Sequence, residues 1–131
     1  MKNILFVEDD PNIVEIFRES LLREGFEVLV AGDGIAAMKA LHQAQPDLII
    51  LDLLMPRFNG VDVLKFIRTN PALKQVKVII FSNVARVADI ALEAERIGAD
   101  AFLPKLTCTP EQLIYAINTL LCDDTAVGEQ L

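Results

Sequence analysis

Five short apolar runs recur along the chain, and each is followed by a segment in which apolar residues repeat at helical spacing. The runs span residues 3–7, 27–31, 47–51, 76–81 and 101–103. Residues 48–51 are apolar without alternation, which predicts a strand that is covered on both faces, as in a parallel sheet. After the first run, Ile13, Ile16, Phe17 and Leu21 share one face of a predicted helix. The pattern therefore alternates strands with helices.

Five such alternations predict a doubly wound (βα)5 sandwich of the α/β class. A chain of 131 residues suits five parallel strands in the flavodoxin-like order 2-1-3-4-5. Asp10-Pro11 is expected to open the first helix and Gly25 to close it. Residues 109–112 (TPEQ) resemble a capping box for the last helix. The helical pattern ends at Leu121, so we expect one domain over residues 1–121 and a flexible C-terminal tail over 122–131.

Composition narrows the possible functions. The net charge of −7 at pH 7 argues against binding to nucleic acid or to an anionic membrane surface. No apolar stretch reaches the roughly 18 residues of a membrane-spanning helix, and the first run ends in acidic residues, unlike a signal peptide. Cys108 and Cys122 fit no metal or disulfide pattern. We therefore expect an acidic, soluble, cytoplasmic protein with free thiols.

Polar residues stand at the ends of four of these runs. They are Glu8 and Asp9, Asp52, Ser82 and Lys105. Taken singly, each has an ordinary explanation, since acids and serine cap helices or form turns and lysine is mostly exposed. However, the carboxyl ends of parallel strands meet at one edge of the sheet, where ligands bind. Their joint placement therefore predicts one site with three carboxylates, a hydroxyl and an ammonium.

Crowded carboxylates favour a bound cation at this edge. They cannot all ionise cheaply, so either one pKa rises or a cation enters. An all-oxygen, carboxylate-rich site with open positions suits Mg²⁺. A hydroxyl and an ammonium can then hold the oxygens of a phosphoryl group while a carboxylate attacks it. The set is complete for phosphoryl transfer to an aspartate.

The sequence around these residues resembles the receiver domain of two-component response regulators. The resemblance rests on ILFVEDDP at residues 4–11, DLIILDLLMP at 47–56 followed by Asn59-Gly60, VIIFS at 78–82 and GADAFLPK at 98–105. Each motif is weak alone, but the ordered set is specific and covers residues 2 to about 121. The resemblance implies a signalling protein that is not an enzyme beyond catalysing its own phosphorylation and dephosphorylation.

The resemblance also implies roles at the matching positions. Asp52 is the expected phosphoacceptor. Mg²⁺ is expected to bind Asp9 and Asp52 directly, Glu8 through water, and the backbone carbonyl of Leu54. No other cofactor is implied.

The resemblance also implies a conformational switch and the partner proteins that act on it. Ser82 is expected to bond the phosphoryl oxygen with Lys105, and Phe102 to turn inward as Ser82 moves. The resemblance implies that the phosphoryl donor is a sensor histidine kinase or a histidine phosphotransfer protein. A downstream protein is expected to read the face formed by the fourth helix, the fifth strand and the fifth helix.

The sequence departs from the family pattern beside the site. Leu106 follows Lys105 where the family usually has proline, and Pro104 precedes it, so the loop is expected to sit differently. Asn83 stands where the family has a very small residue and is expected to crowd phosphoryl access. Leu54 and Val84 occupy positions that influence water attack. Because both are apolar, we expect a long-lived phospho-aspartate.

Parts of the sequence also suggest other functions. Gly32-Asp33-Gly34 matches part of a dinucleotide-binding motif, but it follows the second run and Asp33 would repel a pyrophosphate. A haloacid-dehalogenase-like phosphatase needs a second aspartate two residues after the nucleophile, where Leu54 stands. A phosphorylation-independent interaction module stays open as the main alternative. The chain is expected to be a stand-alone receiver, or else a piece of a longer regulator.

Overall fold

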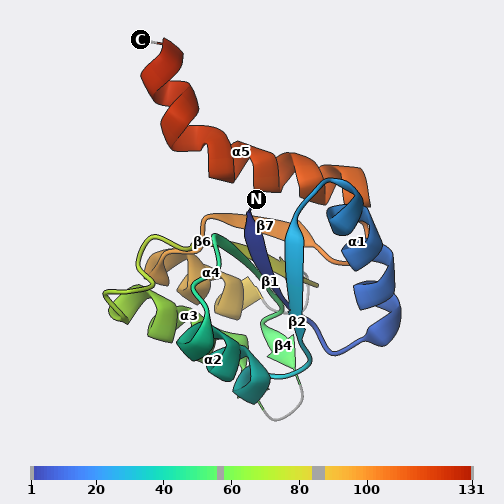
Figure 1. Cartoon of the computed structure of the whole chain (residues 1–131). Helices are drawn as coiled ribbons and strands as arrows, with labels where there is room; N and C mark the ends of the chain where they lie inside the picture. Colours follow the sequence, from blue (N-terminus) through green and yellow to red (C-terminus); the bar gives the residue numbers. More distant parts are fainter. Residues whose placement is uncertain (1, 56–57, 84–87, 131) are drawn as a thin grey trace.

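A computed structural model describes residues 2–55, 58–83 and 88–130 and shows a central sheet between two layers of helices (Figure 1). The sheet has five parallel strands in the order β2-β1-β3-β6-β7. They are β1 (Asn3–Val7), β2 (Glu27–Ala31), β3 (Leu48–Leu51), β6 (Lys77–Ser82) and β7 (Ala101–Pro104). Counted along the chain, this is the order 2-1-3-4-5, so the predicted fold class is confirmed. All four residues of β3 are buried, as their unbroken apolar pattern predicts.

A short antiparallel hairpin follows β3. It consists of β4 (Leu54–Met55) and β5 (Phe58–Asn59), in which Leu54 pairs with Asn59. The sequence pattern did not predict these strands, because two residues are too few to show a period. The hairpin stands between Asp52 and the next helix, and therefore at the edge where the polar residues are expected.

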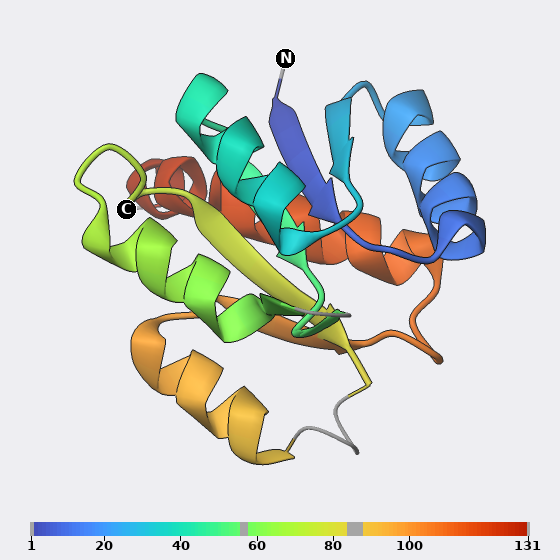
Figure 2. The same cartoon turned by 90° about the horizontal axis from the view of Figure 1, so that it is seen from below.

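Helices cover both faces of the sheet. They are α1 (Pro11–Arg23), α2 (Gly34–Gln43), α3 (Gly60–Thr69), α4 (Ala88–Ile97) and α5 (Pro110–Gln130). Alternate residues of β1 point to opposite faces: Ile4 and Phe6 pack in a core with α1 and α5, whereas Leu5 and Val7 pack in a core with α2 and α3. Figure 2 shows α4 beside α3 on that second face. Both faces of the central strands are therefore buried.

Local side chains fix where the helices begin and end. Asp10 and Asp33 each accept a hydrogen bond from a backbone N–H in the first turn of α1 and α2, at 2.9 and 2.7 Å. Thr109 and Gln112 bond each other's backbone N–H at 3.1 and 2.9 Å, which confirms the capping box of α5. After α1, Gly25 has a φ of 91°, a conformation that favours glycine. Because Asp33 is a helix cap, its segment needs no dinucleotide to explain it.

The last helix is longer than the sequence pattern indicates. Its apolar pattern ends at Leu121, whereas α5 continues to Gln130 and extends past the sheet (Figure 1). The structure thus has helix where the apolar pattern predicts a flexible tail, and the flexibility of residues 122–131 stays a prediction. The end of the apolar stripe shows where packing against the sheet stops, and no proline follows Leu121 to end the helix there. No helix in the described ranges combines the length and apolar character needed to cross a membrane.

Candidate functional site

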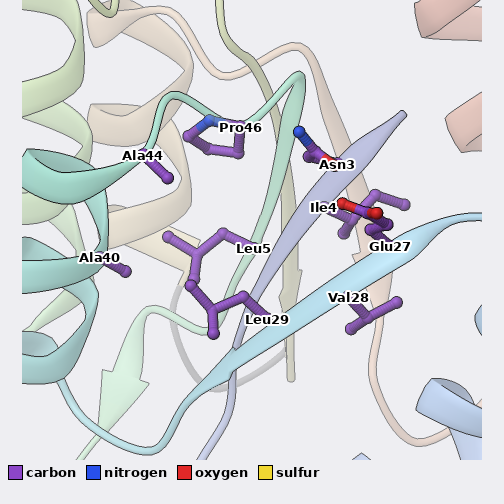
Figure 3. Close-up of a pocket in the computed structure, with 9 residues that line it drawn as sticks. All are labelled: Asn3, Ile4, Leu5, Glu27, Val28, Leu29, Ala40, Ala44 and Pro46. Atoms are coloured by element: carbon purple, nitrogen blue, oxygen red, sulfur yellow. The ribbon is translucent and has the colours of Figure 1, made fainter. Parts of the chain in front are cut away.

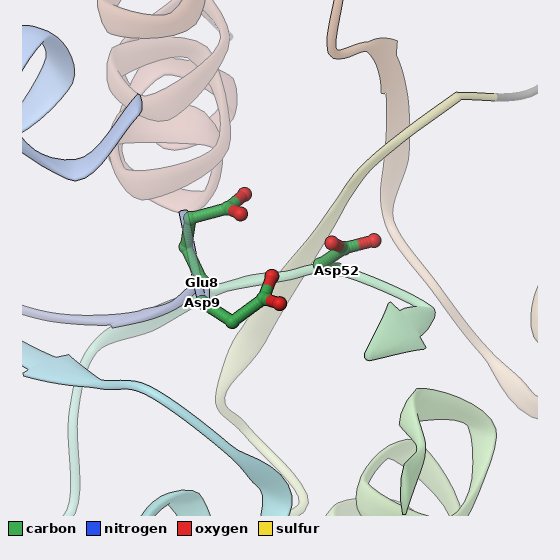
Figure 4. Close-up of side chains that lie close together, drawn as sticks. All are labelled: Glu8, Asp9 and Asp52. Atoms are coloured by element: carbon green, nitrogen blue, oxygen red, sulfur yellow. The ribbon is translucent and has the colours of Figure 1, made fainter. Parts of the chain in front are cut away.

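The carboxyl ends of neighbouring strands bring three acidic residues together. Oxygen atoms of Glu8, Asp9 and Asp52 lie within 4.8 Å of one another (Figure 4). Glu8 and Asp52 are buried, whereas Asp9 is exposed. Strands β1 and β3 end in register, with Val7 opposite Leu51, so the residues that follow the two strands meet. The expected clustering is present at the predicted edge of the sheet.

Both carboxylate oxygens of Asp52 accept hydrogen bonds. Oδ1 accepts from Ser82 Oγ at 2.9 Å and from the Leu54 N–H at 3.0 Å. Oδ2 accepts from Lys105 Nζ at 2.9 Å. Ser82 is the last residue of β6 rather than a helix cap, and the Lys105 side chain is only 17% exposed. These two residues therefore belong to the acidic site and do not have the ordinary roles considered from the sequence.

The Lys105 ammonium bridges two buried carboxylates. Its Nζ lies 2.8 Å from Glu8 Oε2 and 2.9 Å from Asp52 Oδ2. Burial lowers the pKa of Lys105, but its hydrogen bonds to both carboxylates outweigh burial and hold the pKa above its usual value. The side chain is therefore a charged counter-ion at neutral pH.

The Lys105 ammonium contacts Asp52 even though Leu106, and not proline, follows Lys105. The Lys105 N–H donates to the Ser82 carbonyl at 3.1 Å, which ties the end of β7 to β6. Leu106 is 77% exposed, so its side chain points away from the buried carboxylates. No peptide bond among the described residues is cis. The departure at Leu106 is therefore compatible with the contact between Lys105 and Asp52.

Glu8 has one oxygen that lacks a donor. Its Oε2 accepts from Lys105 and from the Asp10 N–H, the latter at 3.1 Å. Its Oε1 is buried without a hydrogen-bond partner in the part of the chain that the structure describes. Burial raises the pKa of Glu8, and its bonds to Lys105 and Asp10 offset this only in part.

A hard cation fits these donors. An unpaired buried oxygen is costly in free energy, and a cation beside Glu8, Asp9 and Asp52 would supply the missing positive charge. The donors are carboxylate oxygens, which Mg²⁺ prefers. The site can therefore hold such an ion next to a buried aspartate that already contacts a hydroxyl and an ammonium.

The other residues predicted for the site are more exposed to solvent than Glu8 and Asp52. Leu54 is 44% exposed and contributes its N–H to Asp52. Asn83 is half-buried directly after Ser82. Phe102 is half-buried and packs against the core beneath α2 and α3. Val84 lies outside the described residues.

The sequence does not reveal the backbone N–H groups that donate hydrogen bonds at the site. The N–H groups of Leu54 and Asp10 each bond a carboxylate two residues earlier in the chain. Aspartate readily forms such short turns, so the signal was present for Asp52, but it could not be told apart from other turn residues. Asn59 and Gly60 belong to the motif that follows Asp52, but their residue types alone predict no role at the site.

A separate apolar pocket lies at the opposite end of the sheet. Its volume is about 240 Å³, and it is lined by Asn3, Ile4, Leu5, Glu27, Val28, Leu29, Ala40, Ala44 and Pro46 (Figure 3). These residues come from β1, from β2, from the end of α2 and from the loop that follows α2. The lining is mainly apolar and offers no group of carboxylates like that around Asp52, so the chemistry described above does not belong to this pocket.

The fold and the site together define a doubly wound α/β domain with an acidic, lysine-bridged site at its topological switch point. The family model of the response regulator receiver domain matches residues 4–118. This chain belongs to the response regulator receiver domain family, and the resemblance seen in the sequence is confirmed.

Similar proteins support the assignment of this chain to the family. The DNA-binding response regulator MtrA of Mycolicibacterium smegmatis is 33% identical over 120 residues, which cover 92% of this chain and 50% of MtrA. The transcriptional regulatory protein CpxR of Escherichia coli is 40% identical over 121 residues, with 92% and 50% covered. The chain thus spans about half the length of these relatives.

Two solved structures share the fold over nearly their whole length. The chemotaxis response regulator CheY4 of Vibrio cholerae matches with a TM-score of 0.83 and 27% identity, covering 92% of this chain and 98% of CheY4. The response regulator TrrA of Thermotoga maritima, solved in complex with Mg²⁺-BeF, matches with a TM-score of 0.78 and 33% identity, covering 92% and 99%. Both are therefore similar to this chain along nearly all of it.

Proposed function

We propose that this chain is a phosphoacceptor receiver of a two-component or phosphorelay system and that Asp52 takes the phosphoryl group. The observation that carries the proposal is the environment of Asp52, which is 2% exposed and bonded to both Ser82 and Lys105. A structural aspartate would need neither the acidic pair Glu8 and Asp9 nor the half-buried Lys105 ammonium beside it. Family membership supports the same conclusion.

In the proposed reaction, an Asp52 carboxylate oxygen attacks the phosphorus of a phosphohistidine. A P–O bond forms, the P–N bond breaks, and its electron pair leaves with the imidazole. Lys105 is placed to neutralise charge on the phosphoryl oxygens, and the Ser82 hydroxyl to donate to one of them. Glu8, Asp9, Asp52 and the Leu54 carbonyl would hold Mg²⁺, which when bound screens the negative charge of the carboxylates and the phosphoryl group. The Mg²⁺-BeF complex of TrrA supports this choice of ion.

The proposed output is a change in the face formed by α4, β7 and α5. Ser82 ends β6, and Phe102 lies in the adjacent strand β7. A shift of Ser82 toward a phosphoryl oxygen would therefore change the packing of Phe102 and the surface above it. We propose that a sensor histidine kinase or histidine phosphotransfer protein supplies the phosphoryl group and that a downstream protein reads this face. The net charge of −7 supports a protein partner for this domain over nucleic acid or an anionic membrane surface.

Intact mass after incubation with acetyl phosphate or phosphoramidate tests the proposal. We expect a gain of one phosphoryl group that requires Mg²⁺, and no gain in the Asp52→Asn variant. The Asp62→Asn variant is a matched control, because Asp62 is an exposed carboxylate on α3 outside the acidic cluster. No gain with either donor would refute the phosphoacceptor function and favour a phosphorylation-independent interaction module. A gain that persists in Asp52→Asn would place the acceptor elsewhere.

A further inference from the structure

Gly60, the first residue of α3, lies directly against the backbone that carries Asp52. We propose that Gly60 is a positioning residue for the acidic site: without a side chain, it lets α3 start against Asp52 and Leu53 and so fixes the Asp52 carboxylate and the Leu54 carbonyl. The inference rests on the proposed function, because it concerns the residues assigned there to hold Mg²⁺.

The space at Gly60 is too small for any other residue. A Cβ atom built there would lie 2.5 Å from the Asp52 carbonyl oxygen and 2.7 Å from the Leu53 Cα. Both neighbours are backbone atoms, which cannot rotate aside as the end of a side chain can. A methyl group at this position must therefore displace either α3 or the segment that holds Asp52.

The displaced element would be the segment rather than the helix. Helix α3 is anchored in the core by Val63, Leu64 and Ile67, each with no exposed surface. Its first turn is also held by the Asn59 side chain, which accepts from the Val61 N–H at 2.9 Å. By contrast, Leu54 and Met55 leave the sheet after β3 and pair only with the nearby Asn59 and Phe58, and the Asp52 N–H reaches the Val7 carbonyl of β1 at 3.3 Å. A clash at Gly60 should therefore move Asp52 and its neighbours.

The pairing of Gly60 also orients Leu54. The Gly60 N–H donates to the Leu53 carbonyl at 3.1 Å, so these two residues form a hydrogen-bonded pair that extends the β4–β5 hairpin. Hydrogen-bonded and non-hydrogen-bonded pairs alternate in antiparallel strands. The next pair, Leu54 with Asn59, is then of the second kind, and the Leu54 carbonyl points away from the hairpin. That carbonyl is therefore available as a ligand.

Two other positions provide matched controls. Gly32 lies in a second strand-to-helix loop at the same edge of the sheet, but an added Cβ there would meet nothing within 4 Å. Asn59 caps helix α3, which begins at Gly60. Asn59→Ala therefore loosens the start of α3 without placing an atom against Asp52. Gly32→Ala tests the loss of a glycine, and Asn59→Ala tests the loss of stability.

Titration with MgCl₂, followed by NMR of the backbone amides, measures the affinity of each variant, and urea unfolding measures its stability. We expect Gly60→Ala to bind Mg²⁺ at least about tenfold more weakly, the loss typical when the surroundings that orient metal ligands are disturbed. Gly32→Ala should stay within about twofold of the unmodified chain. Asn59→Ala should lose stability but keep most of its affinity. Unchanged affinity in Gly60→Ala, or an equal loss in Asn59→Ala, would overturn the proposal.

Hydrogen exchange in the unmodified chain gives a second readout, which decides the matter if Gly60→Ala does not fold. We expect Mg²⁺ to slow exchange of the Gly60 N–H more than that of the Ala37 N–H, which is bonded in the first turn of α2 at 3.0 Å. Equal protection of both amides would count against the role of Gly60. A chain that binds Mg²⁺ but accepts no phosphoryl group would refute the proposed function while leaving these affinity tests valid.

Discussion

Lys105 Nζ lies 2.9 Å from Asp52 Oδ2, although 53 residues separate them in the chain. The same ammonium lies 2.8 Å from Glu8. One half-buried positive charge thus faces two buried carboxylates, with the exposed carboxylate of Asp9 beside them. Because buried charges are costly unless they are paired, this site is stabilised further by any proton or cation that enters it.

Replacing Lys105 with methionine leaves Glu8 and Asp52 without their ammonium. In EDTA at pH 8 we expect the free energy of unfolding to fall by about 3 kcal/mol, which is typical when one partner of a buried ion pair is removed. The loss should be smaller at pH 5. Burial already raises the pKa of Glu8, and without Lys105 it should rise further. A carboxyl whose pKa is higher in the folded state stabilises the fold at low pH and loses that contribution as the pH rises.

Urea unfolding at both pH values measures this effect. The exposed Lys65, which pairs with Glu93 at 3.5 Å, provides the control Lys65→Met on the surface. The interpretation fails if Lys105→Met loses the same stability at pH 5 as at pH 8.

Mg²⁺ should stabilise the folded chain through the acidic cluster. A ligand present at 100 times its Kd adds about 2.7 kcal/mol when it binds only the folded state. We expect saturating MgCl₂ to raise the urea midpoint of the unmodified chain, and Asp9→Asn to lose most of that rise. Asp62→Asn should keep it. Equal responses in the two variants would show that the ion acts by general screening instead.

The exposed Leu54 should protect a phosphorylated Asp52 from water. Its side chain is apolar and 44% exposed beside Asp52, so it cannot orient an attacking water molecule. We expect Leu54→Asn to shorten the lifetime of the phospho-aspartate by about tenfold or more, because an amide can position that water. Decay of the phosphorylated mass after removal of the donor measures the lifetime. A lifetime of seconds in the unmodified chain would contradict the expectation.

Arg68 joins several elements at the other end of the sheet. From α3, its guanidinium donates to the carbonyls of Gly98 at 3.0 Å, Lys74 at 3.2 Å and Val76 at 2.7 Å, and to Asp100 Oδ2 at 2.9 Å. The Arg68 side chain is 18% exposed. Its loss would leave several half-buried acceptors without a donor.

We therefore expect Arg68→Ala to lower the free energy of unfolding by about 3 kcal/mol, within the range for broken buried networks. Lys65→Ala on the same helix should change it by no more than about 0.5 kcal/mol, because an exposed ion pair contributes little. Urea unfolding of both variants measures the difference. Similar losses would mean that the hydrogen bonds of Arg68 contribute no more to stability than the exposed ion pair of Lys65.

The two cysteines should differ in reactivity. Burial raises the pKa of the Cys108 thiol, so less of it is thiolate at a given pH. Cys122 is exposed. We expect iodoacetamide at pH 8 to modify Cys122 first, and labelling of Cys108 to increase only at higher pH. Cys122→Ser isolates the slower site, and equal initial rates for both thiols would contradict the prediction.

The amino-acid sequence alone determined the sheet and the composition of the site. Unbroken apolar runs such as residues 48–51 predicted buried parallel strands, and the polar residues Glu8, Asp52 and Ser82 at strand ends predicted one shared edge. These signals are local: a run of side chains reports its own burial, and parallel strands bring their carboxyl ends together whatever the details of packing. The helix caps at Asp10 and Thr109 are local for the same reason.

Tertiary structure decided the contacts that set the chemistry. Spacing in the chain does not reveal that the Lys105 ammonium contacts both Glu8 and Asp52. Nor does it reveal that the Ser82 hydroxyl donates to Asp52 Oδ1. The close approach of Gly60 to the Asp52 carbonyl oxygen likewise depends on where α3 packs against the sheet. Such contacts join segments that are distant in sequence, and differences of about one ångström determine whether a hydrogen bond forms. A pattern of residue types carries no information at that scale, whereas close packing fixes it.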